Sequence, residues 1–187
     1  QLEFRTKDLS FLIDKLQEIN DGIIETTLMG KINLDKIGVF GHSFGGATSI
    51  LSSIIDERID ACLALDAWFV PLKEDVLIKK FNKPFLHVGQ ISWENELNYK
   101  KLDLFLNSCV NDNYKLVIQD AKHFDFTDIP HFSSLTEKLK ISGKIEKHDL
   151  MKIINDLTIG FFNRYLKNDN LFEVEAIHNE YDQLILY

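Results

Sequence analysis

Short apolar runs alternate with stretches of helical periodicity along this chain, and that alternation limits its fold more than any other feature. Four runs have the length and composition of strands, and they span residues 36–41, 61–67, 83–89 and 114–119. Apolar residues at helical spacing mark the segments 8–20, 45–55, 95–109 and 149–166, with Asp8 the expected N-cap of the first. Strands that are apolar on both faces are typical of parallel sheets covered by helices on both sides. The sequence therefore predicts an α/β fold with a mostly parallel sheet.

Length and charge narrow the class of protein. The 187 residues, 45% of them hydrophobic, suffice for one compact core, and we expect residues 1–187 to belong to a single domain. The net charge of −8 and the lack of a basic stripe argue against a nucleic-acid partner. No stretch approaches the ~18 consecutive apolar residues of a membrane span. The chain opens at Gln1, so we expect its natural N-terminus upstream, and a cytoplasmic or a secreted location both stay open.

The two cysteines, Cys62 and Cys109, lie in apolar segments. Cysteine is among the residue types most often buried, so we expect two free thiols inside the protein. Neither has a second Cys or a His at the close spacing of a metal site, and no metal is predicted.

Residues 41–45, Gly-His-Ser-Phe-Gly, fit the pattern G-x-S-x-G. A strand-like run leads directly into this segment and a helical pattern leads directly out of it, which is the setting of the nucleophile elbow in the α/β-hydrolase fold. The tight turn projects the serine hydroxyl from the edge of the sheet, and the following helix N-terminus favours developing negative charge. We therefore predict Ser43 as a nucleophile and the Phe44 backbone N–H as one oxyanion-hole donor.

A serine nucleophile needs a base, and His123 is the predicted one. It follows the last predicted strand after a three-residue connection, in the loop where this fold delivers its histidine. The other five histidines are less suitable, because they lie within the elbow, inside a strand, in a separate loop, near a helix start or in a polar tail: His42, His87, His131, His148 and His178. We expect the His42 ring to point away from the Ser43 hydroxyl.

Asp66 is the predicted acid that orients the histidine. It closes the apolar run that follows the elbow helix, so its carboxylate should emerge at the same sheet edge as Ser43. Glu94 and Glu96 are the rivals, because they follow the next strand, where many hydrolases place this acid. A capping or turn role is the alternative for Asp66 itself. Asp120 and Asp125 are expected to be loop residues.

Aromatic residues close to these positions could line an acyl pocket. The predicted pocket residues are Trp68, Phe69, Phe124 and Phe126, with Phe132 a further candidate at the rim. Ordinary core packing is the alternative for each of them.

Three segments together resemble one known family. They are GHSFGGAT at 41–48, LALDAWFVPL at 63–72, and an H-x-x-F-x-D pattern formed by His123, Phe126 and Asp128. This set is similar to that of the intracellular and plasma platelet-activating factor acetylhydrolases, the group VII phospholipases A2. The likeness extends over residues 36–166. That family takes its acid from the strand after the nucleophile, which favours Asp66 over Glu94.

The resemblance implies a calcium-independent serine esterase, without metal or organic cofactor, that cleaves short or oxidised sn-2 acyl groups from phospholipids and contacts membranes peripherally. The strands that precede the nucleophile strand in such proteins, and the loop that gives the second oxyanion donor, are expected outside this sequence. A general carboxylesterase or a lactone or polyester hydrolase, acting on small soluble esters, is one alternative. A non-catalytic binding protein of the same fold is another. The residues carry no signal for an oligomeric state.

Overall fold

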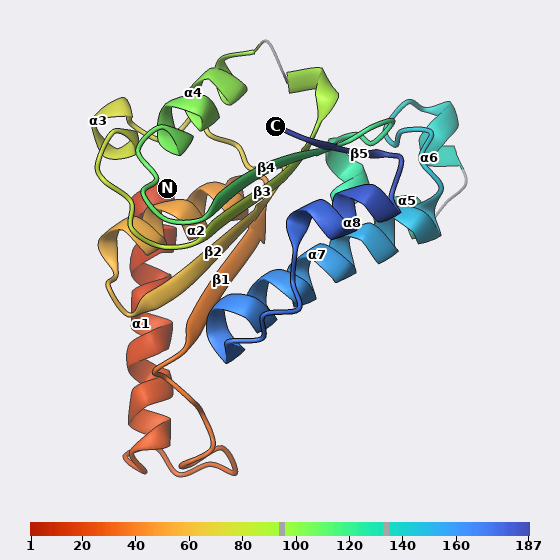
Figure 1. Ribbon diagram of the computed structural model, residues 1–187. Coiled ribbons are helices and arrows are strands. Elements are labelled where there is room, and N and C mark those ends of the chain that lie inside the picture. The colour runs from red at the N-terminus through yellow and green to blue at the C-terminus, as the bar shows by residue number, and fades with distance from the viewer. Residues whose placement is uncertain (94–95, 133–134) are drawn as a thin grey trace.

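The computed structural model describes residues 1–93, 96–132 and 135–187, and a five-stranded sheet lies at its centre (Figure 1). The strands cross the sheet in chain order, and they are β1 (Ile37–His42), β2 (Ile59–Leu65), β3 (Phe85–Gln90), β4 (Asn113–Ile118) and β5 (Leu184–Leu186). Strands β1 to β4 run parallel, and β5 runs antiparallel to β4. The predicted α/β class with a mostly parallel sheet is confirmed.

Helices cover both faces of this sheet. The described helices are α1 (Leu2–Asn20), α2 (Phe44–Ile55), α3 (Glu74–Leu77), α4 (Leu97–Leu106), α5 (Ile129–Phe132), α6 (Leu135–Lys138), α7 (Lys147–Lys167) and α8 (Val174–Glu180), with 3₁₀ turns η1 (Ile91–Trp93) and η2 (His123–Phe126). Side chains of α1, α2 and α4 share one core cluster, and those of α7 and α8 share a second. Figure 1 shows α1 and α2 on one side of the sheet and α7 and α8 on the other.

The central strands explain why the apolar runs are continuous. All residues of β3 are buried, and in β2 only Asp60 is partly exposed. Cys62 and Ala64 join the cluster that contains α2, whereas Leu63 and Leu65 join the cluster that contains α7. Because successive side chains of a strand point to opposite faces, a strand covered on both sides must be apolar throughout.

The predicted strands agree with the observed ones to within two residues. The first helix differs, because α1 begins at Leu2 with Gln1 as its N-cap, so the prediction of Asp8 as the cap is wrong. Leu2 and Leu9 pack against the core, and this tertiary contact extends the helix by almost two turns beyond Asp8. The predicted helix at 95–109 is observed as α4; its predicted first residue, Asn95, lies outside the described residues.

The C-terminal segment contains two elements that the sequence pattern does not predict, α8 and β5. Leu184 and Leu186 pair with β4, and Val174 and Tyr181 are buried in the cluster beneath α7. The segment is rich in Asn, Asp and Glu, and three apolar residues in a row are too short a pattern to indicate a strand. Packing against an existing sheet edge supplies the stabilisation that the local sequence lacks.

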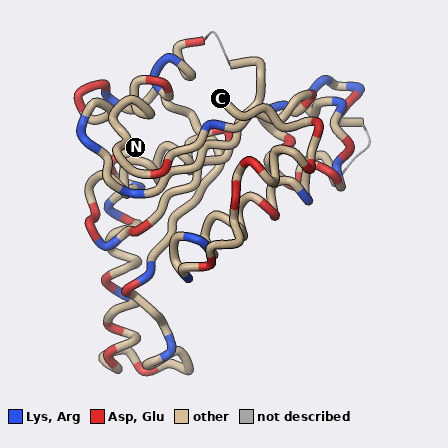
Figure 2. Tube along the Cα trace, viewed as in Figure 1, with Lys and Arg blue, Asp and Glu red and all other residues tan. Residues whose placement is uncertain are grey.

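Charged residues lie mainly on the helices and loops, and few lie on the strands (Figure 2). Within the described ranges, no helix is long and apolar enough to cross a membrane. Among those same residues, no group of three or more His, Cys, Asp or Glu side chains could hold a metal ion. Both cysteines are free, Cys62 fully buried and Cys109 partly so.

One histidine lies at the centre of the core. His87 of β3 is completely buried between the rings of Phe69 and Tyr99, at 5.9 and 5.6 Å between ring centroids. Neither of its ring nitrogens hydrogen-bonds to any part of the chain that the structure describes. Burial, and to a smaller extent the Lys115 ammonium, lower the pKa of His87 to about 3. The folded protein therefore holds this ring in its neutral form.

We expect His87→Leu to make the protein less sensitive to acid. The unfolded chain binds a proton at His87 near pH 6.5, whereas the folded chain binds it only near pH 3, so the free energy of unfolding falls as the pH drops through this window. Between pH 7 and pH 5, the protonation of His87 in the unfolded chain should lower the free energy of unfolding of the wild type by about 2 kcal/mol. The His87→Leu variant lacks this group and should not show this part of the loss. Urea unfolding at both pH values measures the difference. His148→Leu is the control, because His148 is exposed. An equal fall in the free energy of unfolding between pH 7 and pH 5 in the wild type and in His87→Leu would contradict the expectation.

Candidate active site

Ser43 occupies the single residue between β1 and α2, in a strained backbone conformation. Its φ and ψ are 56° and −119°, a region that residues with a side chain rarely adopt. Two backbone hydrogen bonds hold it there: the Ser43 N–H donates to Leu65 O at 3.0 Å, and the Trp68 N–H donates to Ser43 O at 2.9 Å. Both partners belong to β2 or its following loop, so the neighbouring strand fixes the turn.

Two glycines make room for this turn. A Cβ added to Gly41 would lie 2.5 Å from the Gly45 carbonyl group, and one added to Gly46 would lie 2.6 Å from the Ala67 Cβ. A Cβ on Gly45 itself would have no neighbour within 4 Å. The first glycine of the G-x-S-x-G pattern is therefore needed for close backbone approach, and the second is not.

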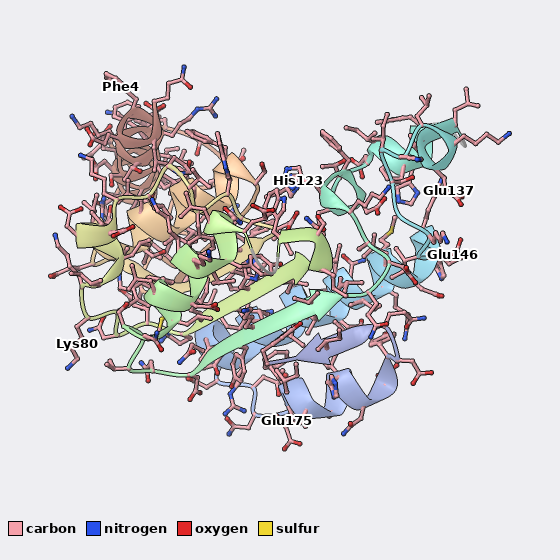
Figure 3. The ribbon with its side chains drawn as sticks, turned by 90° about the horizontal axis from the view of Figure 1, so that it is seen from above. Phe4, Lys80, His123, Glu137, Glu146 and Glu175 are labelled. Carbon is pink, nitrogen blue, oxygen red and sulfur yellow. The ribbon has the colours of Figure 1, made fainter. Side chains whose placement is uncertain are left out.

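The side chains of Ser43, His123 and Asp66 form a continuous hydrogen-bonded chain. The His123 Nε2 lies 2.9 Å from Ser43 Oγ, and its Nδ1 lies 2.7 Å from Asp66 Oδ2. Ser43 and Asp66 follow the ends of the adjacent parallel strands β1 and β2, and His123 begins η2 after β4. In Figure 3, His123 lies toward the middle of the molecule, with Glu137 and Glu146 farther out on the same side.

The environment of Asp66 determines where the protons lie among the side chains of Ser43, His123 and Asp66. Its side chain is fully buried, which raises the pKa of the carboxyl group, while its hydrogen bond to His123 and the neighbouring Gln90 amide act in the opposite direction. The second oxygen, Oδ1, makes no hydrogen bond of normal geometry with the described residues. A carboxylate at Oδ2 accepts the Nδ1 proton of His123, so Nε2 is left as the acceptor for the Ser43 hydroxyl.

Phe44 is the first residue of α2, directly after Ser43. The first N–H groups of a helix have no partner within the helix, and the helix dipole makes this end partly positive.

The four aromatic residues predicted to line a pocket divide into two pairs. Trp68 and Phe124 are 43% and 44% exposed, and their rings lie 6.2 Å from Phe44 and 5.5 Å from His123, respectively. Phe69 and Phe126 are buried instead. Phe69 packs in the core against Phe105 and His87, and Phe126 stacks with the His42 ring. For these two, core packing is what the structure shows. The fifth candidate, Phe132, is 82% exposed on α5.

Two residues that the sequence pattern did not mark, Trp93 and Gln90, also lie at the site. The Trp93 ring lies 4.9 Å from the His123 ring, and with Trp68 it lines an open hollow of about 400 Å³. Gln90 ends β3 beside Asp66. The sequence could have indicated both residues, because Gln90 closes a buried strand and Trp93 follows it, at the same sheet edge as Asp66.

The rival residues that the structure describes are not members of this hydrogen-bonded chain. Glu96 caps α4 at the N-terminus and is exposed, and Glu94 lies outside the described residues. His131 and His148 are exposed on α5 and α7. Asp125 is a buried residue of η2, and its carboxylate accepts hydrogen bonds from the backbone N–H groups of Lys122 and Gly143.

Comparison with known proteins places the chain in a protein family. The family model "Platelet-activating factor acetylhydrolase, isoform II" matches residues 1–183. Curated proteins named platelet-activating factor acetylhydrolase are similar to the chain: that of Cavia porcellus is 28% identical over 148 residues (78% of this chain, 34% of that protein), and that of Gallus gallus 30% over 145 residues (74% and 33%). The chain spans about a third of the length of these relatives.

A solved structure shares the fold. It is a ferulic acid esterase from Streptomyces cinnamoneus, with a TM-score of 0.76 at 19% identity, and the match covers 99% of this chain and 54% of that one. At this identity the likeness concerns the fold alone, and it identifies the sheet and its helices as the α/β-hydrolase fold that the sequence predicted.

Proposed function

Because the chain belongs to the platelet-activating factor acetylhydrolase, isoform II, family, we propose that it carries the catalytic residues of a serine esterase. The observation that carries the proposal is the hydrogen-bonded chain from Ser43 Oγ through His123 to the buried Asp66, at 2.9 and 2.7 Å. A serine in a strained strand-to-helix turn, a histidine within reach of its hydroxyl and a buried acid behind that histidine are the three parts that acyl transfer needs.

In the proposed reaction, Ser43 Oγ attacks the carbonyl carbon of an ester while His123 Nε2 takes its proton. Asp66 keeps the His123 ring in the tautomer that accepts this proton and stabilises the imidazolium that forms. The Phe44 N–H donates a hydrogen bond to the developing oxyanion. His123 then gives its proton to the leaving alcohol, and water hydrolyses the acyl-enzyme by the same route in reverse.

For the substrate, we propose short or oxidised sn-2 acyl esters of phospholipids. The surface near the His123 loop supports this, because Phe132, Leu135 and Leu139 are 82%, 55% and 66% exposed on and after the short helices α5 and α6. Exposed apolar side chains beside lysines such as Lys138 and Lys140 are suited to the boundary of a lipid layer, where both parts of the surface find partners. This exposed apolar surface is the proposed peripheral membrane contact.

The test combines covalent labelling with two substrates. We expect a fluorophosphonate probe to label Ser43, and the protein to release acetate both from an sn-2 acetyl phospholipid in vesicles and from nitrophenyl acetate. Ser43→Ala should abolish labelling and both activities, because the acyl-enzyme forms on the Ser43 hydroxyl. Ser108→Ala is the matched control, since this serine follows α4 and its hydroxyl donates to the Phe105 carbonyl at 2.7 Å.

Each other outcome identifies an alternative. Hydrolysis of nitrophenyl acetate with no hydrolysis of the phospholipid would favour a general carboxylesterase or a lactone or polyester hydrolase. No labelling of Ser43 in folded protein would favour a non-catalytic binding protein of this fold.

A further inference from the structure

The half-buried side chain of His42, directly before the nucleophile, contacts the histidine loop. Its Nε2 lies 2.9 Å from the backbone carbonyl oxygen of His123. The two imidazole rings lie 4.5 Å apart at 38°, and the Phe126 ring stacks on His42 at 6.2 Å and 13°. The ring thus hydrogen-bonds to the His123 backbone and lies against the rings of two residues of η2.

We propose that His42 is a positioning residue, which holds the loop of His123 in register with the nucleophile elbow; this inference rests on the proposed function of Ser43 and His123. The topology shows why such a link is needed. β1 and β2 are neighbours, so backbone hydrogen bonds fix Ser43 relative to Asp66. β2 and β3 separate β4 from β1, so no strand pairing connects the two. The His42–His123 contact ties the end of β1 directly to the loop after β4.

The hydrogen bond also fixes the protonation state of His42. A carbonyl oxygen only accepts, so His42 must carry its proton on Nε2. Burial, followed by the proximity of His123, lowers the pKa of His42 to about 4. His42 is therefore neutral when His123 takes the Ser43 proton, and it places no second cation 4.5 Å from the ring that receives that proton.

The rest of the loop is held from its other side. The Asp125 carboxylate accepts hydrogen bonds from the backbone N–H groups of Lys122 and Gly143, at 2.8 and 2.7 Å. Asp66 orients the His123 ring at Nδ1. Among the described residues, the side chain that hydrogen-bonds to the His123 backbone itself is His42. Its loss should let the imidazole shift relative to Ser43 while the rest of the loop remains folded.

Two substitutions separate the hydrogen bond from the packing. His42→Phe keeps a planar ring between His123 and Phe126 but has no donor, and His42→Gln loses the ring but can donate an amide N–H to the same carbonyl. For hydrolysis of nitrophenyl acetate we expect His42→Phe to lower kcat about 10-fold with KM changed less than about twofold, because a small misplacement of the base acts on the chemical step. His42→Gln should recover at least half of that loss on a logarithmic scale.

A second readout does not depend on turnover. In imidazole ¹H–¹⁵N spectra of the wild type, we expect His42 protonated on Nε2 alone and a slowly exchanging Nδ1 proton on His123. That proton should exchange faster in His42→Phe and return toward wild-type behaviour in His42→Gln. An unchanged kcat and unchanged exchange in His42→Phe would overturn the positioning role, as would equal losses in both variants. If the wild type hydrolyses no ester, the proposed function fails, whereas the spectra still decide whether His42 positions His123.

Discussion

Replacement of Asp66 by asparagine should lower kcat for ester hydrolysis by roughly 10⁴-fold. An asparagine amide can present its NH₂ group to His123 Nδ1, which then becomes the acceptor, so the proton moves to Nε2 and the Ser43 hydroxyl loses its base. The side chains are of equal size, and asparagine tolerates the φ of 39° found at this position. The variant should therefore fold, and its melting temperature should stay close to that of the wild type. Steady-state kinetics with nitrophenyl acetate measures the loss.

Matched variants test whether Asp66 is the acid. Glu96 follows the next strand, as the acid does in many hydrolases, but it is exposed at the start of α4. We expect Glu96→Gln and Glu94→Gln each to retain kcat within about threefold, because Asp66 already occupies His123 Nδ1. A fall of several orders of magnitude in either of them, with Asp66→Asn fully active, would transfer the role to the rival residue and contradict the assignment made from the 2.7 Å contact with His123.

Replacement of Gly41 by alanine should lower kcat/KM at least about 100-fold. The new methyl group would lie 2.5 Å from the carbonyl carbon and oxygen of Gly45 and 2.9 Å from the Gly46 nitrogen. All three are backbone atoms at the start of α2, so no side chain can swing aside to relieve the clash. The helix must move away from β1, and the Ser43 hydroxyl moves with it. We also expect the free energy of unfolding to fall by about 1–3 kcal/mol.

Gly45→Ala is the matched control within the same motif. It adds the same methyl group at a position where nothing lies within 4 Å, and its backbone conformation suits a residue with a side chain. Its unfolding midpoint in urea should equal or exceed that of the wild type, since alanine favours the helix over glycine. Urea unfolding and fluorophosphonate labelling of the two variants show whether the damage comes from the steric clash at Gly41 or from the loss of any glycine in the motif. Equal damage from both substitutions would show that the turn is not limited by the contact at Gly41.

The local sequence was sufficient for the elements whose pattern is long or whose chemistry is local. β2 and β3 are continuous apolar runs because helices cover both of their faces, whereas a strand with one exposed face would alternate between apolar and polar residues. The elbow could be found because a glycine that permits close approach, the serine and the next helix all lie within a few residues. α1 was predicted too short, since its first turns depend on contacts with the core rather than on a capping residue.

The other features depend on residues that are distant in sequence. β5 is a strand only because the edge of β4 is available to pair with Leu184 and Leu186. Phe69 and Trp68 are adjacent in sequence, yet one lies in the core and the other on the surface beside Phe44. An aromatic residue after a strand has the same local pattern in both cases, so only the surrounding elements decide which of the two becomes buried.

The place of Ser43 in a strand-to-helix turn was thus predictable from the sequence, because the glycine that permits the turn, the serine and the next helix are near neighbours in the chain. The hydrogen bonds that hold the turn come instead from β2 and the loop after it. The distances from Ser43 to His123 and from His123 to Asp66 were decided only by the tertiary structure. Strand order places β2 beside β1 and separates β4 from β1 by two strands, so the His123 loop must return across the sheet to meet the serine. His42 contacts the His123 carbonyl where this loop meets the end of β1. The local sequence around either residue does not predict this contact.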